Sequence, residues 1–268
     1  MKPGFYDIPH ETYHGTEYQD YTSSSDFKRM EKSMAHYRYY KDNPPESNAV
    51  FDFGRIFHTA VLEPDKLKNQ VVVWDKDKRG KAWTEFKEKH QNKVILKPDE
   101  FETIAAMSTA VQFHDIASAI ISHKEAEVEK AVLWYDKDTG EKCKAKPDIR
   151  VEPEGLIADL KSVQSAEPGM FSRACANYGY MYQSAFYADG ASAVSGKDHK
   201  HFLFICVEKD PPHAVMVYEA DYEFIETGRI KYRELLKQLS QCKIENKWPG
   251  YPVGIKTLSL PAWATQID

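Results

Sequence analysis

The residue pattern changes sharply near residue 126, and this change constrains the fold more than any other feature. Before it, apolar residues recur at helical spacing and predict helices over residues 22–40, 48–63 and 98–122. A short strand in "NQVVVW" and a short helix in "KAWTEFKEKH" lie between the last two. After it, the β-like runs "EVEKAVLWYD", "CKAKPDIRV" and "LIADLKS" are joined by the turn sequences "KDTGEK" and "EPEG". These runs predict an antiparallel meander.

The rest of the chain alternates helices and strands. A helix is predicted over residues 170–194, two strands in "HFLFICVEKD" and "HAVMVYEAD", and a last helix over residues 222–246. This order predicts an α/β fold with a mixed central β-sheet flanked by helices. We expect one domain over residues 1–268, with a mainly helical part (1–125), a sheet with flanking helices (126–246) and a tail packed on the body (247–268).

Composition excludes several classes of protein. No apolar run approaches the roughly 20 residues that span a bilayer, and the N-terminus lacks the pattern of a signal peptide, so we expect a cytoplasmic protein without a membrane partner. The net charge of −5 means that a nucleic-acid partner requires basic groups concentrated locally. No C-x-x-C pair occurs, which predicts buried thiols and no iron–sulfur cluster; the cysteines are Cys143, Cys175, Cys206 and Cys242.

Two acids and a lysine stand together in "KAKPDIRVEPEGLIADLKS". Strand alternation places Asp159 and Lys161 on one face, and the short "EPEG" turn brings Asp148 beside them. Two converging carboxylates suit a hard cation, and the lysine would orient a water molecule or offset charge on a phosphate. The alternative is an exposed ion pair worth at most about 1 kcal/mol, although an apolar strand rarely carries such charges without a reason.

Further motifs make a resemblance specific. Pro147-Asp148, ten intervening residues and Asp159-Leu160-Lys161 resemble the PD-(D/E)xK signature of a nuclease superfamily. Gln183 and Tyr187 resemble its Q-x-x-x-Y motif, and Gly54 with His58 resembles the G-x-x-x-H motif of its RecB-like branch. Together with "PGFYDIPHETYH", "SSSDFKRM", "FGRIFHTAVLEP" and "LPAWA", nearly the whole chain is similar to the C-terminal nuclease domain of the RecE (exonuclease VIII) family.

The resemblance implies a restriction-endonuclease-like core and an Mg²⁺-dependent exodeoxyribonuclease, with Mn²⁺ as a substitute. Such an enzyme degrades linear double-stranded DNA from the 5′ end to mononucleotides and leaves 3′ single-stranded tails for recombination. It also implies a ring-shaped homotetramer and the strand-annealing protein RecT as a partner. The implied metal ligands are His58, Asp148, Asp159 and the Leu160 carbonyl, and the implied further catalytic residues are Lys161, Gln183 and Tyr187.

Purely structural roles remain open for some of these residues. A lone histidine on an apolar helix is often a core residue, and Gln183 with Tyr187 would also suit a helix packed on the sheet. The segment "DKDKRGKAW" would clamp phosphates or stack on a terminal base, or it is a solvated charged loop. Its candidate DNA-binding residues are Lys76, Lys78, Arg79, Lys81 and Trp83.

Three rival functions also remain. The same core would serve an endonuclease or a Cas4-like nuclease, although the unclustered cysteines argue against the iron–sulfur site of the latter. The third rival is a catalytically silent DNA-binding or scaffold module. Such a module would be expected to lose Asp148, Asp159 or Lys161, and all three are present.

Overall fold

A computed structural model describes residues 1–44 and 49–260 of the chain. Its helices are α1 (His10–His14), η1 (Thr16–Tyr18), α2 (Ser24–Lys32), α3 (Met34–Asp42), α4 (Ala49–Leu62), α5 (Pro64–Gln70), α6 (Gly80–Lys89), α7 (Pro98–Phe113), α8 (Asp115–Ile121), α9 (Pro168–Tyr178), α10 (Tyr180–Ser195) and α11 (Tyr222–Glu245). Its strands are β1 (Gly4–Tyr6), β2 (Val71–Val73), β3 (Val94–Leu96), β4 (Ala126–Val128), β5 (Ala131–Tyr135), β6 (Lys142–Ala145), β7 (Ile149–Val151), β8 (Leu156–Val163), β9 (His201–Glu208) and β10 (Val215–Glu219).

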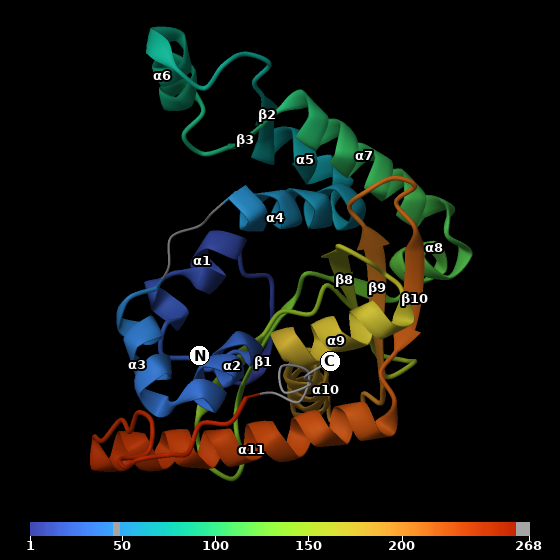
Figure 1. The fold of residues 1–268 in the computed structure, drawn as a ribbon. Coiled ribbons are helices and arrows are strands. Elements are labelled where there is room, and N and C mark those ends of the chain that lie inside the picture. Colours follow the sequence, from blue (N-terminus) through green and yellow to red (C-terminus); the bar gives the residue numbers. More distant parts are fainter. Residues whose placement is uncertain (45–48, 261–268) are drawn as a thin grey trace, which may run out of the picture.

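The central sheet has five strands in the order β10-β9-β8-β7-β4. Strands β8, β9 and β10 of this sheet are labelled in Figure 1. Strands β8 and β9 are parallel, and the other neighbours are antiparallel. The predicted α/β fold with a mixed, helix-flanked sheet is therefore confirmed. Strands β1, β5 and β6 form a second, antiparallel sheet, and β2 and β3 form a parallel pair.

The predicted single meander is wrong, because two of its three runs are divided between the two sheets. The run over residues 127–136 breaks at Glu129, whose φ of 53° is incompatible with an extended strand. The run over residues 143–151 breaks at Lys146 to Asp148, where Pro147 offers no backbone N–H to a sheet. The chain therefore passes from one sheet to the other and back within this hairpin.

Three helices that the sequence predicts as continuous are each broken into two. At Ser33 and His114 the side chain accepts a hydrogen bond from a backbone N–H three residues later, which starts α3 and α8 as separate helices. At Gly179 the left-handed backbone ends α9. Pro64 occupies the first turn of α5, which the sequence did not predict. The segment between the predicted helices over residues 22–40 and 48–63 falls partly on residues 45–48, outside the described residues.

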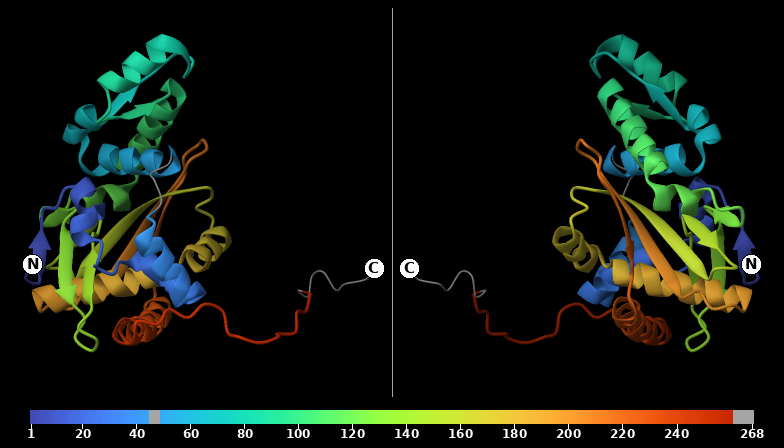
Figure 2. Two further views of the ribbon diagram at one scale, coloured as in Figure 1. Left: turned by 90° about the vertical axis from the view of Figure 1, so that its left-hand side faces the viewer. Right: turned by 90° about the vertical axis from the view of Figure 1, so that its right-hand side faces the viewer.

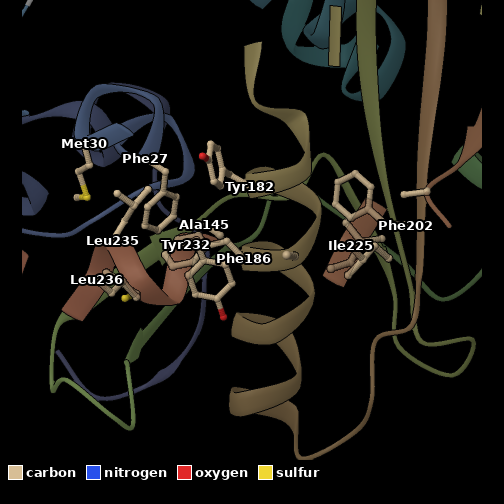
Figure 3. Close-up of a cluster of buried hydrophobic side chains, with 14 of the residues drawn as sticks. Phe27, Met30, Ala145, Tyr182, Phe186, Phe202, Ile225, Tyr232, Leu235 and Leu236 are labelled. Carbon is tan, nitrogen blue, oxygen red and sulfur yellow. The ribbon is translucent and has the colours of Figure 1, made fainter. Parts of the chain in front are cut away.

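The helices cover both faces of the central sheet, and β8 contributes to both cores. Ile157 lies in the cluster that β9 forms with α2, α10 and α11, part of which is shown in Figure 3. Ala158 and Leu160 lie in the cluster on the opposite face, with α4 and α7. Helices α10 and α11 approach closely, since a Cβ at Gly228 would lie 1.9 Å from the Met181 carbonyl oxygen.

Two segments extend from the body. The unit of β2, α6 and β3, here called the arm (residues 71–96), projects beyond α4 and α7 (Figure 1). The tail contacts α3 through Trp248, whose ring centroid lies 6.2 Å from that of Tyr37, and through Pro249, whose carbonyl accepts from Ala35. Residues 252–260 are exposed and lead away from the body (Figure 2), unlike the tail that we expected.

The exposed part of the tail adopts neither helix nor strand, and its proline and glycine residues disfavour both. Residues 261–268, which include most of "LPAWA", lie outside the described residues. The four cysteines are buried and free, as predicted. Among the described helices, none is by itself long and apolar enough to cross a membrane; only α7 with α8, bent by 94°, passes by length and composition.

Candidate active site

The candidate site lies where the hairpin strands leave one sheet for the other. Glu129 stands between β4 and β5, and Asp148 stands between β6 and β7. The Glu129 backbone N–H donates to the Asp148 carbonyl at 3.0 Å, so the two crossings are joined. Sheet pairing on both sides fixes this backbone, and the two acidic side chains are therefore held close together beside β8.

Asp148 is held from two directions. Its Oδ2 accepts from the Leu160 backbone N–H at 2.6 Å, and its Oδ1 lies 3.4 Å from His58 Nδ1 on α4. Burial would raise the pKa of Asp148, but its interactions with His58, with Lys161 and with the Leu160 N–H lower it. Burial likewise disfavours a charged His58, but Asp148 raises the pKa of this histidine to about 9. The two groups form an ion pair at neutral pH.

A second acid, Glu129, completes a group suited to a metal ion. Ligand atoms of His58, Glu129 and Asp148 all lie within 4.8 Å of one another. One imidazole nitrogen with carboxylate oxygens is a donor set that Mg²⁺ and Mn²⁺ accept. Glu129 also pairs with Lys146, whose Nζ lies 2.9 Å from its Oε2. Burial and the nearby Asp148 raise the pKa of Glu129, although Lys146 and His58 oppose the shift.

Glu129 was not among the residues predicted from the sequence. Its position within an apparently continuous strand gave no reason to place it beside Asp148, because the left-handed turn at this residue has no signal in a glutamate. The structure brings His58 and Asp148 together as the resemblance implies. Asp159 lies outside the group with Glu129, and Leu160 contributes its N–H to Asp148; whether the Leu160 carbonyl binds a metal stays a prediction.

Asp159 and Lys161 point to the same face of β8, as strand alternation predicts. Lys161 Nζ lies 2.6 Å from Asp159 Oδ2, and Asp159 is only 3% exposed. The pair is therefore not the solvated surface pair that the sequence left open. Burial raises the pKa of Asp159 to about 6 although Lys161 opposes the shift. Burial would lower the pKa of Lys161, but Asp159 and then Tyr180 raise it above its usual value.

Helix α10 supplies one side chain that binds both members of this pair. The Gln183 Nε2 donates to Asp159 Oδ1, and its Oε1 accepts from Lys161 Nζ at 2.9 Å. Tyr187 lies one helical turn further on, with its ring 6.4 Å from that of Phe202. Burial, followed by the charge of Asp159, raises the pKa of Tyr187 to about 12, so this phenol stays protonated. Because Gln183 binds both Asp159 and Lys161, its role goes beyond packing of the helix on the sheet.

Histidines of α1 also border the site. The rings of His10 and His14 lie 4.5 Å apart. Burial, followed by positive neighbours that include Lys146, lowers the pKa of each to about 4. Both imidazoles are therefore neutral at pH 7. Neither histidine was among the residues predicted from the sequence.

The predicted basic segment lies on the arm, which Figure 1 shows at the edge of the molecule. Arg79 and Lys81 are paired with acids of the arm, at 2.7 Å from Asp77 and 3.6 Å from Glu85. The Trp83 ring packs at 5.7 Å from that of Trp74, with Lys78 over its face at 5.8 Å. Trp83 is thus engaged within the arm, and DNA binding by this segment stays a prediction.

Comparisons with known proteins bear on the family and the fold of the chain. The model of the family described as a PDDEXK-like domain of unknown function (DUF3799) matches residues 23–258. A solved structure of a putative exonuclease from Eubacterium rectale is similar with a TM-score of 0.66 and 13% identity, over 96% of each chain. A phage related exonuclease from Haemophilus somnus 129PT has a TM-score of 0.36 and 13% identity, over 85% of this chain and 96% of that one. No curated protein matches the sequence significantly.

Proposed function

The chain belongs to the family of PDDEXK-like domains, and from this premise we propose that it is a metal-dependent nuclease that hydrolyses phosphodiester bonds in DNA. One observation carries the proposal, namely that Asp148, Asp159 and Lys161 are held close together. The Leu160 N–H binds Asp148, and Gln183 binds both Asp159 and Lys161, which also pair with each other. Buried acids and a partly buried lysine are costly to keep charged, so their assembly in one place favours a chemical role.

The residues present fit a divalent ion. His58, Glu129 and Asp148 would hold it. Asp159 and the Leu160 carbonyl would complete the binding set, as the family resemblance implies. We propose Mg²⁺ as the natural ion and Mn²⁺ as a substitute, because the donors are mainly oxygen atoms. When bound, such an ion lowers the pKa of water and offsets the charge of the scissile phosphate.

The chain's own groups supply the remaining chemistry. Lys161 stays protonated because its pKa is raised, so it orients the attacking water and donates to a phosphate oxygen. Gln183 fixes the positions of Lys161 and Asp159 through one hydrogen bond to each. Tyr187 is protonated in the folded chain. Its hydroxyl group would donate a hydrogen bond to the catalytic strand β8 or to the nucleic acid backbone.

We further propose an exonuclease that degrades linear duplex DNA from the 5′ end to mononucleotides. Support comes from the resemblance to the RecE family and from the structurally similar protein described as a putative exonuclease. The same resemblance supports a homotetrameric ring and a role before strand annealing by RecT. The exposed lysines of the arm would then contact DNA phosphates and keep the substrate engaged.

A labelled-DNA assay tests the function and its rivals. Linear duplex labelled at one 5′ end should release labelled mononucleotide early, and only with Mg²⁺. Cutting of closed circular DNA would indicate an endonuclease, and binding without cutting would indicate a silent module. The variants Asp159→Ala and Lys161→Ala should each abolish degradation.

The chain contains a matched control for these variants. Asp198 and Lys200 form another D-x-K pair, with their charged atoms 3.2 Å apart, but both side chains are largely exposed. Asp198→Ala and Lys200→Ala should therefore leave the degradation rate unchanged. Near wild-type rates for Asp159→Ala or Lys161→Ala would show that the active site lies elsewhere.

A further inference from the structure

We propose that Tyr178 and Tyr180 form a stacking platform for an unpaired nucleobase next to the catalytic lysine. The inference rests on the proposed nuclease function and names a determinant of its substrate. The two rings lie 5.7 Å apart at an interplanar angle of 28°, a stacked arrangement. Tyr178 is 68% exposed, whereas Tyr180 is only partly exposed. The stacked pair therefore lies beside the site, and its outer ring, that of Tyr178, is exposed to solvent.

The pair is continuous with the reaction centre. Lys161 Nζ lies 4.3 Å from the centroid of the Tyr180 ring, and the same ammonium group is paired with Asp159. A base held on Tyr178 would thus have its own backbone within the reach of the groups that act on phosphate. This placement ties base binding to the cutting position rather than to a remote surface.

The inner tyrosine is immobilised by the core. Its ring stacks on Phe204 at 5.8 Å and 30°, and also contacts Phe171 at 6.1 Å. Aromatic rings therefore follow one another from the core through Tyr180 to Tyr178. A nucleobase would be the next ring in this series, and stacking on a fixed ring costs little conformational entropy.

The turn between the tyrosines is built for this arrangement. Gly179 has φ 73° and ψ 37°, ends α9 and directly precedes α10. A Cβ at this position would lie 2.8 Å from side-chain carbons of both Lys28 and Tyr182. The turn thus requires glycine for its backbone and for its packing, and it fixes how the two tyrosines are presented.

The chemistry of the occupant follows from the platform. An aromatic face accepts every base, so binding would tolerate any sequence. Bases inside a duplex are already stacked on their neighbours, so only a base released from pairing offers a free face. The occupant is therefore the terminal, frayed base of the strand being cut.

Fluorescence of 2-aminopurine tests the platform without relying on catalysis. In an Asp159→Asn background, the protein would be mixed with a duplex that carries one unpaired 2-aminopurine at a 5′ end. Stacking should quench the fluorescence on binding. Tyr178→Ala should remove the quenching and weaken binding about 10-fold, whereas Tyr178→Trp should keep both. Tyr135→Ala, which removes another exposed tyrosine on β5, should change neither.

The outcomes separate this inference from the proposed function. Unchanged quenching and affinity in Tyr178→Ala would overturn the platform even if Asp159→Ala abolishes degradation as proposed. Weaker binding accompanied by a smaller native mass would assign Tyr178 to a contact between copies and would also overturn it. Failure of the wild type to degrade any DNA would overturn the nuclease proposal, and the platform with it.

Discussion

The backbone N–H of Leu160 donates a hydrogen bond of 2.6 Å to Oδ2 of Asp148. The strand that carries Asp159 and Lys161 therefore also positions the acid that precedes β7. Both groups are buried, so the hydrogen bond is needed for folding as well as for site geometry. Substitutions at position 148 can separate these two roles.

Asp148→Asn keeps an oxygen that accepts from Leu160 but loses the negative charge. We expect a stable fold with metal affinity lowered at least about 100-fold, measured by calorimetric titration with Mn²⁺. Asp148→Leu additionally leaves the buried Leu160 N–H unpaired, which should cost about 1–3 kcal/mol in urea unfolding. Asp198→Asn is the exposed control. Equal stabilities of Asp148→Asn and Asp148→Leu would contradict the structural role of the bond.

Asp159 and Lys161 should be strongly coupled in stability. Removing one partner leaves the other buried without its countercharge, which typically costs about 3–5 kcal/mol. The double variant Asp159→Ala/Lys161→Ala should therefore lose clearly less stability than the sum of the two single variants, by urea unfolding. The same cycle on Asp198 and Lys200 should show additive, small effects. Additive losses for the buried pair would contradict an ion pair shielded from water.

Gln183→Glu tests the bridging amide. A carboxylate would still accept from Lys161, but it would face Asp159 without a hydrogen to donate. We expect a loss of roughly 10–100-fold in the rate of DNA degradation, with a pH profile shifted because the pKa of Asp159 rises further. Gln238→Glu on the exposed face of α11 is the control. An unshifted profile would argue that Gln183 does not contact Asp159 in the working enzyme.

Protons and metal should compete at His58. Its pKa of about 9 in the folded chain exceeds the ordinary 6.5, so between these values the folded state binds more protons than the unfolded state. The metal-free protein should lose stability as the pH rises from 6.5 to 9. Metal affinity should rise about tenfold per pH unit over the same window, since a ligating histidine must be neutral. His58→Asn should flatten both dependences, which thermal unfolding and titration with Mn²⁺ would measure.

The arm should control the salt dependence of DNA binding. Removal of one cation that binds a phosphate should make the slope of log affinity against log salt shallower by roughly 0.9. Replacing Lys76, Lys78, Arg79 and Lys81 together with alanine should therefore reduce the slope by up to about 4, by fluorescence anisotropy. A matched variant lacking Lys137, Lys231, Lys237 and Lys247 should change it less. Equal changes would show that the arm has no special role.

The sequence predicted the features that depend on local periodicity. Strand alternation alone placed Asp159 and Lys161 on one face, and the "EPEG" turn returned the next strand beside Asp148. The breaks at Ser33 and His114 were missed because these residues act as caps only through side-chain geometry, which spacing does not reveal. Gly179 sits at a break that its residue type could have indicated.

Features that depend on tertiary contacts could not be predicted from the sequence by physical argument. Glu129 joins the site because the chain changes sheets there, and a glutamate gives no sign of a left-handed backbone. His58 was selected only through a family resemblance, since its helix and the sheet lie far apart in the sequence. The roles of Gln183 and Tyr187 also came from the motif, although the amide geometry around Gln183 now gives one of them a physical reason.

The two crossings of the chain between the sheets have a consequence for biosynthesis. The donors from His58 to Gln183 come from well-separated parts of the chain, and the backbone between Glu129 and Asp148 is fixed only when both sheets have formed. A nascent or partly folded chain would therefore lack the means to gather a cation or to cut nucleic acid. The ability to bind a cation at this site would therefore arise only with the finished tertiary structure.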